Sequence, residues 1–333
     1  MIISKTPYRI SFFGGGTDFP EWYSINKGLT ISTTIDYYLY ITARYLPSFF
    51  KNINYRLSYS KIENVKNVED IKHRVIREYL NYIKTKSPLE MHVDSDLPAR
   101  SGLGSSSAFI VGLINSFNTL LKQPINSKKL FEKAIYFEQK VLNDFCGSQD
   151  QVITALGGFR KITYQKNKIS TSLVNISSHR KKKLEESLVI VFTGFSRNAT
   201  QVEKNKIKLI NKKTKNYKEI YSLAIEAKQV FENGKSDLND IGKLLHESWK
   251  IKKTLSNNVS NLKINKIYDY AIANGATGGK ILGAGNGGFL LFYVQKKNKK
   301  KFLLRMNKFL NFPVVFSNHG SRIIYKSDEK IKV

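Results

Sequence analysis

A glycine- and serine-rich segment that runs directly into an apolar helical pattern constrains the fold of this chain most strongly. The segment spans Leu97–Ala108 and follows an expected strand around Met91–Val93, which Pro98 ends. Beyond it, apolar side chains recur at three- and four-residue spacing, the pattern of a helix that packs one face against a core. These side chains are Ile110, Leu113, Ile114, Phe117, Leu120 and Leu121. The chain therefore has a strand, a loop of small residues and a core helix in succession.

The start of this helix suits a bound anion. The first N–H groups of a helix have no partner within it, and this end carries partial positive charge. Serine can cap such an end, and glycine lets an anion approach the backbone closely. From this segment alone two interpretations stay open, a phosphate-binding loop and an ordinary capped core helix.

Composition bounds the class of protein. The chain has 333 residues, of which 41% are hydrophobic, enough for one or two folded cores. Its single cysteine, Cys146, excludes an internal disulfide and favours a reducing compartment. Residues 1–10 lack the apolar run of a signal peptide, and the helix after Ser107 is too short and polar to span a bilayer. We therefore expect a cytoplasmic protein without membrane contact.

The formal net charge of +29 raises the question of nucleic-acid binding. Most of the basic residues are lysines spread along the chain, whereas nucleic-acid recognition relies on the planar fork of arginine. Dense clusters at 180–183 and 296–301 are expected to be surface turns. We expect no specific nucleic-acid partner; a basic RNA-binding protein without catalytic activity is the alternative from a different class.

The order of elements predicts two domains, 1–185 and 186–333. The first contains strand-like segments, helices near 70–84 and 126–143, and a weakly patterned stretch from 157 to 186. The second is expected to read strand, helices, two strands, helix and strand. Its expected elements are a strand at 188–192, helices at 199–234, 237–250, 261–274 and 298–310, and a closing strand pair at 314–317 and 322–325.

Familiar nucleotide and metal motifs are largely excluded. Gly283, Gly285 and Gly288 match the dinucleotide fingerprint by letter, but an apolar strand follows them where that fold needs a helix. No Walker A sequence and no protein-kinase signature is present. The five histidines are isolated in the sequence, so a zinc site has no support.

Several polar features remain that each have a plain structural interpretation. Gly14–Asp18 combines a flexible backbone with hydrogen-bonding side chains, which suits a polyhydroxyl ligand or an ordinary turn. Glu138 borders an apolar helix face. It is either a functional carboxylate or an ordinary exposed glutamate of the helix. Asp150 precedes an apolar helix start, where it is either a capping residue or a catalytic one.

Taken together, three segments resemble the signature motifs of the GHMP small-molecule kinases. They are Pro7–Asp18, Pro98–Ala108 and Gly283–Gly288, and they occur in the order typical of that family. The resemblance extends from residue 5 to about 293. It implies an α+β protein of two domains, the first like ribosomal protein S5 domain 2 and the second ferredoxin-like. ATP and a sugar would bind in the cleft between them.

Within the family, the chain most resembles the D-glycero-D-manno-heptose 7-phosphate kinases. Gly15 and Gly16 stand where galactokinases have glutamate and histidine, and 193–197, 246–253 and 279–285 also look like the heptose subgroup. The implied enzyme is a phosphotransferase that uses ATP and Mg²⁺ to phosphorylate the anomeric hydroxyl, giving the 1,7-bisphosphate for nucleotide-activated heptose synthesis. An anomeric kinase for an unphosphorylated, fucose- or galactose-like sugar is the alternative.

The resemblance also implies roles for individual residues in phosphoryl transfer. Asp150 would accept the proton of the acceptor hydroxyl, while Arg9, with Lys5 as a weaker candidate, would stabilise the transferred charge. Ser106 and Glu138 would hold Mg²⁺. The ATP phosphates would lie on Arg100, Ser101, Gly102, Leu103, Gly104, Ser105, Ser106 and Ser107.

The acceptor sugar would bind between two of the glycine-rich segments. The implied contacts are Gly14, Gly15, Gly16, Thr17, Asp18, Gly285, Asn286 and Gly287. A phosphate on the acceptor needs a second basic pocket, for which Arg197 is preferred, followed by Arg44, Lys252 and Lys280. The expected partners are ATP and a small sugar phosphate, and the expected assembly is a monomer or homodimer.

Overall fold

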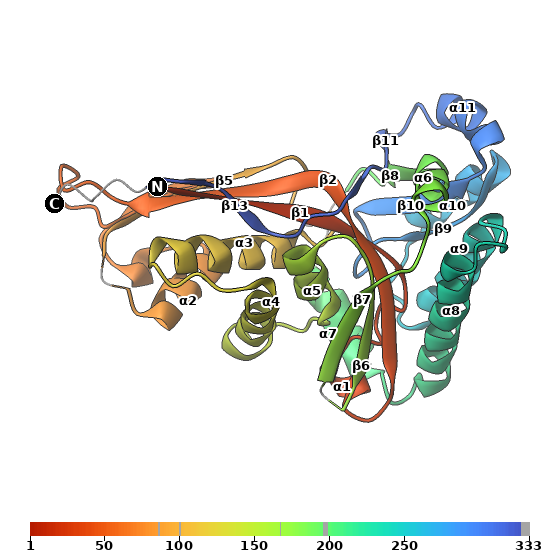
Figure 1. Cartoon of the computed structure of the whole chain (residues 1–333), viewed down its shortest axis with the longest axis horizontal. Helices are drawn as coiled ribbons and strands as arrows, with labels where there is room; N and C mark the ends of the chain where they lie inside the picture. The colour runs from red at the N-terminus through yellow and green to blue at the C-terminus, as the bar shows by residue number, and fades with distance from the viewer. Residues whose placement is uncertain (86, 100, 167, 196–198, 328–333) are drawn as a thin grey trace.

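The described residues of the chain form two β-sheets with helices packed on them (Figure 1). The computed structural model describes residues 1–85, 87–99, 101–166, 168–195 and 199–327. Helices and strands are mixed in both halves, so the predicted α+β class is confirmed. None of the helices in these ranges combines the length and apolar character that a membrane crossing requires.

The first sheet is organised around β2 (Gly28–Tyr45), a strand of 18 residues. Strand β1 (Ile2–Phe13) runs antiparallel along most of it, β6 pairs with its first half, and β5 pairs with its second half. In the described residues the path of the sheet is β13-β1-β2-β5-β3-β4; β6 and β12 also pair with β2, and β7 pairs with β6. The remaining strands are β3 (Tyr55–Ser58), β4 (Ile62–Val65), β5 (Leu89–Ser95), β6 (Phe159–Gln165), β7 (Lys168–Leu173), β12 (Phe316–Ser317) and β13 (Arg322–Lys326).

Helix α3 (Ser105–Leu120) is the predicted core helix and packs directly on β1 and β2. In Figure 1, α2 and α4 lie on the same side of the long β1–β2 pair as α3. The helix expected over 126–143 is α4 followed by a turn of π-helix, η2, which ends at Val141. The other helices of this half are α1 (Pro20–Tyr23), η1 (Val68–Asp70), α2 (Arg74–Ile83), α4 (Ser127–Tyr136), η2 (Phe137–Val141), α5 (Gln149–Leu156) and α6 (Ser178–Glu186).

The second sheet has the strand order β11-β8-β10-β9, with each neighbouring pair antiparallel. Counted along the chain this order is 4-1-3-2, with helices between the first and second strands and between the third and fourth. That connectivity is the βαββαβ arrangement of ferredoxin-like folds. Its elements are β8 (Leu188–Phe192), α7 (Ala199–Lys208), α8 (Thr214–Glu232), α9 (Asn239–Thr254), α10 (Leu262–Ala273), β9 (Ala276–Ile281), β10 (Phe289–Val294), α11 (Lys296–Arg305) and β11 (Asn311–Pro313).

The end of the chain pairs with the first sheet rather than the second. Strands β12 and β13, assigned from sequence to the second half, return to the first sheet, where β13 pairs with β1 and β12 with β2. Backbone donors and acceptors at the edge of β1 would otherwise lack strand partners, and β13 supplies them. The hydrogen bond between Thr6 Oγ1 and Ser321 Oγ, 2.8 Å long, also ties this returning segment down.

Other sequence expectations also change in the structure. The helix predicted over 199–234 is divided into α7 and α8 by a turn at 209–213. The lysine-rich clusters at 180–183 and 296–301, predicted to be surface turns, lie in helices α6 and α11. Each of these helices buries one apolar side chain, Leu184 or Phe302, while its lysines cover the outside.

A cluster of aromatic rings joins the two halves. Phe231 of α8 packs edge-on against Phe12 of β1 and Phe159 of β6, with ring centroids 5.8 and 5.0 Å apart. Phe316 of the returning β12 completes the cluster beside Phe12 and Phe159. Helix α8 belongs to the second half, whereas β1, β6 and β12 belong to the first sheet. This shared core therefore holds the two halves in one orientation.

We expect the substitution Gly157→Ala to destabilise the fold by roughly 2–4 kcal/mol. Gly157 has φ +72°, and a Cβ there would lie 2.0 Å from the carbonyl carbon of His319 in the returning segment. Urea unfolding measures the difference. Gly234→Ala is the matched control, since no described heavy atom lies within 4 Å of its added Cβ. Equal stability of both variants would contradict the close approach of 319 to 157.

Candidate active site

A cavity of about 1180 Å³ lies where the glycine-rich segments meet. Gly15 and Gly16 line it from the turn after β1, and Gly102 and Gly104 line it from the loop before α3. Residues 283–285 and Gly287 line it from the loop between β9 and β10. Its volume exceeds the range of roughly 300–1000 Å³ usual for one small-molecule ligand. The cavity is therefore large enough to hold two small reactants side by side.

The loop before α3 and the loop after β9 touch through their backbones. The Phe289 N–H donates to the Ser101 carbonyl over 3.1 Å. A Cβ on Gly288 would lie 2.2 Å from that carbonyl oxygen, and its φ of +86° is one that side chains rarely adopt. Glycine is thus required here, because any side chain would separate the two walls of the cavity.

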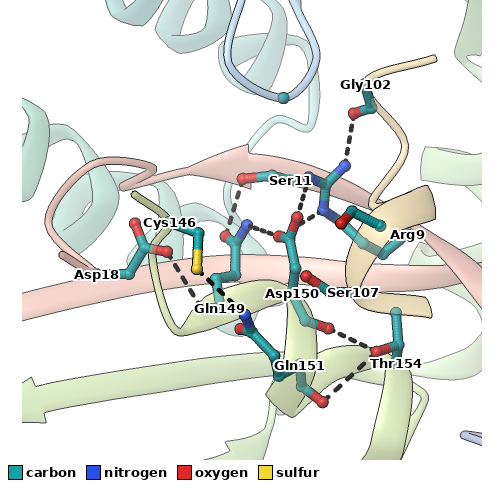
Figure 2. A network of polar contacts seen from close by, with 12 residues as sticks. Arg9, Ser11, Asp18, Gly102, Ser107, Cys146, Gln149, Asp150, Gln151 and Thr154 are labelled. Atoms are coloured by element: carbon teal, nitrogen blue, oxygen red, sulfur yellow. Dashed lines mark hydrogen bonds and ion pairs between the residues drawn. The ribbon is translucent and has the colours of Figure 1, made fainter. Parts of the chain in front are cut away.

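An ion pair between Arg9 and Asp150 occupies the floor of the cavity. Arg9 Nε and Nη2 donate to the two Asp150 carboxylate oxygens over 2.7 and 2.5 Å. Arg9 Nη1 donates to the Gly102 carbonyl over 2.6 Å, so one guanidinium spans from α5 to the loop before α3 (Figure 2). Such a two-point contact fixes both the position and the plane of the carboxylate.

Gln149 adds a further restraint on Asp150. Its amide nitrogen donates to Asp150 Oδ1 over 3.0 Å, and Ser11 Oγ donates to its amide oxygen over 2.8 Å. A carboxylate offers about four lone-pair positions, and these described contacts use two on Oδ1 and one on Oδ2. Asp150 therefore retains an acceptor position on Oδ2 in the cavity, where a ligand hydroxyl can donate.

Burial and Arg9 act in opposite directions on Asp150. Burial raises the pKa of this carboxyl, but the charge and hydrogen bonds of Arg9 outweigh it and hold the pKa below its ordinary value. Asp150 is therefore ionised at neutral pH. It is suited to orient a hydroxyl and receive its proton late in a reaction, rather than to deprotonate it in advance.

Asp18 lies beside this pair on the turn after β1. Its carboxylate accepts from the Gly16 N–H over 2.8 Å and from the Gln149 N–H over 3.1 Å. Burial raises the pKa of Asp18 to about 6. A Cβ on Gly147 would lie 1.9 Å from Asp18 Oδ2, so the absence of a side chain at 147 makes room for this carboxylate.

Glu138 of η2 is buried at the start of α3. Its carboxylate accepts from Ser107 Oγ over 3.0 Å, from Ser106 Oγ over 3.4 Å and from Gln151 Nε2 over 2.6 Å. Burial, with a smaller contribution from the charge of nearby Asp150, raises the pKa of Glu138 to about 7. Within the described ranges no cation forms an ion pair with it, so a buried acid lies here without a counter-charge.

This donor set fits Mg²⁺. No group of three or more His, Cys, Asp or Glu side chains suited to a metal occurs among the described residues. One carboxylate and adjacent hydroxyls are nevertheless hard oxygen donors of the kind that Mg²⁺ takes when nucleotide phosphates and water complete its shell. The missing counter-charge of Glu138 favours the same interpretation.

The residues expected at the ATP phosphates separate into two sets. Gly102, Gly104 and 105–107 line the cavity, and helix α3 begins there after Gly104. Ser101 and Leu103 are buried instead and act through their carbonyls, which accept from the Phe289 and Arg9 N–H groups over 3.1 and 3.0 Å. Arg100 and Arg197, two further expected site residues, lie outside the described residues.

Lys5 is not in the cavity, contrary to expectation. Its Nζ lies 3.7 Å from the centre of the Tyr38 ring, an arrangement in which the cation faces the aromatic ring. Four residues along a strand span roughly 13 Å, which separates Lys5 from Arg9. Arg44 is also elsewhere, because it pairs with Glu90 over 2.5 Å and does not line the cavity.

Some expected sugar contacts have structural roles. Gly15, Gly16, Asp18, Gly285 and Gly287 line the cavity, whereas the others do not. Thr17 Oγ1 donates to the Gly14 carbonyl over 2.8 Å and so closes the turn that holds Asp18. The Asn286 side chain accepts from Asn261 Nδ2 over 2.8 Å and supports the opposite loop from behind.

Sequence reasoning missed Lys206 and gave Lys252 and Lys280 only secondary weight. All three line the cavity on the side of Asp18 and Gly283–Gly287. A signal for Lys206 was present, since it recurs with Val202 and Ile210 at four-residue spacing and all are buried. A lysine on the apolar stripe of a helix indicates a buried cation with a specific purpose.

The other end of the cavity is aromatic. The His73 ring lies 4.8 Å from the Tyr59 ring and 5.3 Å from the Phe109 ring, and Pro98 and Val93 lie on the same wall. Burial lowers the pKa of His73, so the ring is neutral at pH 7. Flat aromatic walls of this kind suit a planar aromatic ligand.

Comparison with known proteins gives a consistent family. Residues 70–158 match the family described as GHMP kinases N terminal domain, and 217–311 match GHMP kinases C terminal, together more than half of the chain. The D-glycero-alpha-D-manno-heptose 7-phosphate kinase of Campylobacter jejuni is 29% identical over 92% of this chain and 93% of its own. The galactokinase of Thermotoga petrophila is 23% identical over 88% of this chain and 89% of its own.

Solved structures share the fold. A D-glycero-D-manno-heptose 1-phosphate kinase from Bacteriodes thetaiotaomicron superimposes with a TM-score of 0.79 at 22% identity, covering 98% of this chain and all of that one. Its similarity extends over both sheets, so the arrangement of the two halves around the cavity is the arrangement of that fold.

We expect Asp150→Ala to destabilise the protein by about 3 kcal/mol at neutral pH, because it leaves the Arg9 guanidinium buried without its partner. Urea unfolding measures this loss. The difference from the unmodified protein should shrink as the pH falls below the ordinary 3.8 and on through the lower pKa of folded Asp150. Asp240→Ala, which removes an exposed ion pair with Lys243, is the control and should leave stability unchanged. Equal effects would contradict a stabilising role for the buried pair.

Proposed function

We propose that this chain, which belongs to the GHMP kinase family, phosphorylates the anomeric hydroxyl of D-glycero-D-manno-heptose 7-phosphate with ATP. As a member of that family it is a phosphotransferase with an alcohol group as acceptor. The product would be the 1,7-bisphosphate, made in the cytoplasm for nucleotide-activated heptose synthesis. One observation carries the proposal: Asp150 keeps an acceptor position toward the cavity while Arg9 joins it to the loop before α3.

Phosphoryl transfer needs an aligned acceptor hydroxyl and stabilisation of the charge on the transferred group. Asp150 would meet the first need and Arg9 the second. The acceptor hydroxyl would donate to Asp150 Oδ2, which aligns its oxygen and later takes its proton. Arg9 bridges Asp150 and the Gly102 carbonyl, so its positive charge lies between the acceptor and the loop that faces the phosphates. Charge that develops on the transferred group is stabilised there without rearrangement of the protein.

The nucleotide would extend from the aromatic end of the cavity to this loop. Tyr59, His73 and Phe109 offer flat surfaces for the base, and the phosphates would lie at the positive N-terminal end of α3. Mg²⁺ would be held by Glu138 and Ser106, and when bound it neutralises phosphate charge. The protein's own contribution is to keep Glu138 buried and correctly oriented through Ser107 and Gln151.

Two relatives support a heptose as the acceptor. The proteins from Campylobacter jejuni and Bacteriodes thetaiotaomicron are both named as heptose kinases, although the names give the phosphate a different position. In this chain Gly15 and Gly16 leave space beside Asp18 for a bulky sugar, and Asp18 presents a carboxylate to its hydroxyls. A galactose- or fucose-like sugar is the alternative acceptor, in line with the similarity to a galactokinase.

The proposal is tested by measuring ADP release with Mg²⁺ and ATP against heptose 7-phosphate, heptose, galactose and fucose. We expect turnover with heptose 7-phosphate and a loss of about 10²- to 10⁴-fold in kcat for Asp150→Asn, since the amide cannot receive the proton. Asp240→Asn on the exposed face of α9 is the control. Preference for an unphosphorylated sugar would overturn the substrate, and unchanged kcat in Asp150→Asn would overturn the mechanism.

The metal requirement should depend on pH. Because the pKa of Glu138 is raised to about 7, the carboxyl is partly protonated below pH 7 and must lose that proton to bind a cation. The Mg²⁺ concentration for half-maximal activity should therefore be higher at pH 6 than at pH 8. In the Glu138→Gln variant, the Mg²⁺ concentration for half-maximal activity should be roughly 10- to 100-fold higher and should no longer depend on pH. A requirement that does not vary with pH in the unmodified protein would exclude Glu138 as a ligand.

A further inference from the structure

Three lysine side chains are buried in the wall of the cavity that the second half of the chain supplies. Lys206 of α7, Lys252 of α9 and Lys280 of β9 are 4%, 9% and 3% exposed. Lysine is almost never buried to this degree unless it is paired. Each comes from a different element of the second half, so the fold itself brings them to one wall.

The pairing of these lysines is incomplete. Lys206 Nζ lies 2.8 Å from Glu203 Oε2. Lys252 Nζ donates to the Ile281 and Gly283 carbonyls over 3.1 and 2.6 Å, and Lys280 Nζ donates to the Phe12 carbonyl over 2.8 Å.

Among the described residues, no carboxylate forms an ion pair with Lys252 or Lys280. An ammonium group has three N–H donors, so Lys280 has two and Lys252 one without an acceptor in these contacts. A buried donor without a partner is costly to the fold. Both side chains line the cavity, so a ligand can reach those donors.

The cations of this wall lower one another's pKa values. Burial, then the charges of Arg9 and Lys206, lower the pKa of Lys280 to about 7, with Asp18 opposing the change. Burial, then Lys280 and Lys206, lower the pKa of Lys252 well below its ordinary value. The wall therefore carries more positive charge than its own acids balance, and an anion bound there would remove the repulsion.

We infer that Lys206 and Lys280, with Lys252 beside them, bind a phosphate group that the acceptor carries at a position remote from the reacting hydroxyl. The inference rests on the proposed function, because it assumes that the sugar occupies the cavity next to Asp18 and Asp150. It adds the residues that distinguish a phosphorylated from an unphosphorylated sugar.

The position of the cluster assigns it to the acceptor rather than to ATP. Lys280 bonds to the Phe12 carbonyl, immediately before the turn that carries Gly15, Gly16 and Asp18. The nucleotide loop lies on the other side of Arg9, whose guanidinium bonds to the Gly102 carbonyl. Lys252 lies between the two regions, since its charge also lowers the pKa of Asp150. A dianion matches a wall of several ammonium groups better than a neutral hydroxyl does.

When a phosphate binds at this wall, the Lys280 side chain should take up a proton. The bound dianion would raise the pKa of Lys280, so a fraction that is neutral above pH 7 becomes charged on binding. A sugar phosphate has its second pKa near 6 and is already dianionic there, so the ligand does not contribute to the change. The charged groups that face Lys280 from the neighbouring elements are Arg9, Asp18, Lys206 and Lys252, and Glu203 faces Lys252 beside it.

Isothermal titration calorimetry with heptose 7-phosphate and with unphosphorylated heptose tests the inference on the full chain. We expect Lys280→Met to weaken binding of heptose 7-phosphate about 10- to 100-fold and to leave binding of heptose unchanged. The double variant Lys206→Met with Glu203→Gln should act in the same direction, because it removes the cation without leaving Glu203 unpaired. Lys243→Met, on the exposed face of α9, is the matched control.

Two further readouts separate binding from folding. Lys280→Met replaces a buried, repelled charge with an apolar side chain, so its thermal midpoint should not fall below that of the unmodified protein. Titrations at pH 8 in buffers of different ionisation enthalpy should show proton uptake for the unmodified protein and none for Lys280→Met. Loss of affinity together with loss of folding would contradict the site.

The outcomes distinguish this inference from the proposed function. If the unmodified protein turns over heptose 7-phosphate but Lys280→Met weakens both ligands equally or neither, the phosphate site is wrong and the function stands. If heptose 7-phosphate is not turned over, the function is wrong, and titration with inorganic phosphate then decides the site. Binding by the unmodified protein and not by Lys280→Met supports an anion site, while no binding by either overturns it.

Discussion

The ion pair between Arg9 and Asp150 is the interaction on which the candidate site depends. It joins β1 of the first sheet to the first turn of α5, and through the Gly102 carbonyl it also reaches the loop before α3. Without this ion pair, nothing would hold the Asp150 carboxylate at a fixed distance and orientation from the loop that faces the phosphates. Gln149 and Ser11 support the same carboxylate from the side, so its remaining acceptor position points in one direction.

The cavity stores unbalanced charge of both signs at separate places. Glu138 is a buried acid whose pKa is raised to about 7, and Lys280 is a buried base whose pKa is lowered to about 7. Each of these charged groups is unfavourable by itself, because a buried charge without a counter-charge destabilises the fold. Each becomes favourable when a ligand of opposite charge arrives, a cation at Glu138 and an anion at Lys280. Ligand binding should therefore stabilise this protein more than its contact area suggests.

Much of the local structure was predictable because periodicity and small residues act over short distances. The strand at 89–95 and the loop and helix over 97–120 form as expected, and the α+β class is confirmed. Lys5 does not line the cavity although the motif contains both it and Arg9, because the strand holds the two residues roughly 13 Å apart. Thr17 lies in the turn expected to contact the sugar, but its hydroxyl donates to the Gly14 carbonyl instead of facing the cavity.

The sequence by itself determined the family, the fold class and where glycine loops, candidate acids and helices begin, since these follow from neighbouring residues and their spacing. Only the tertiary structure decided that β12 and β13 return to the first sheet, and that Lys206, Lys252 and Lys280 share one buried wall. Those outcomes depend on contacts between residues far apart in the chain. Spacing marks Lys206 as a residue of a buried helix face, but no local pattern shows that it will meet Lys252 and Lys280 when separate elements pack together.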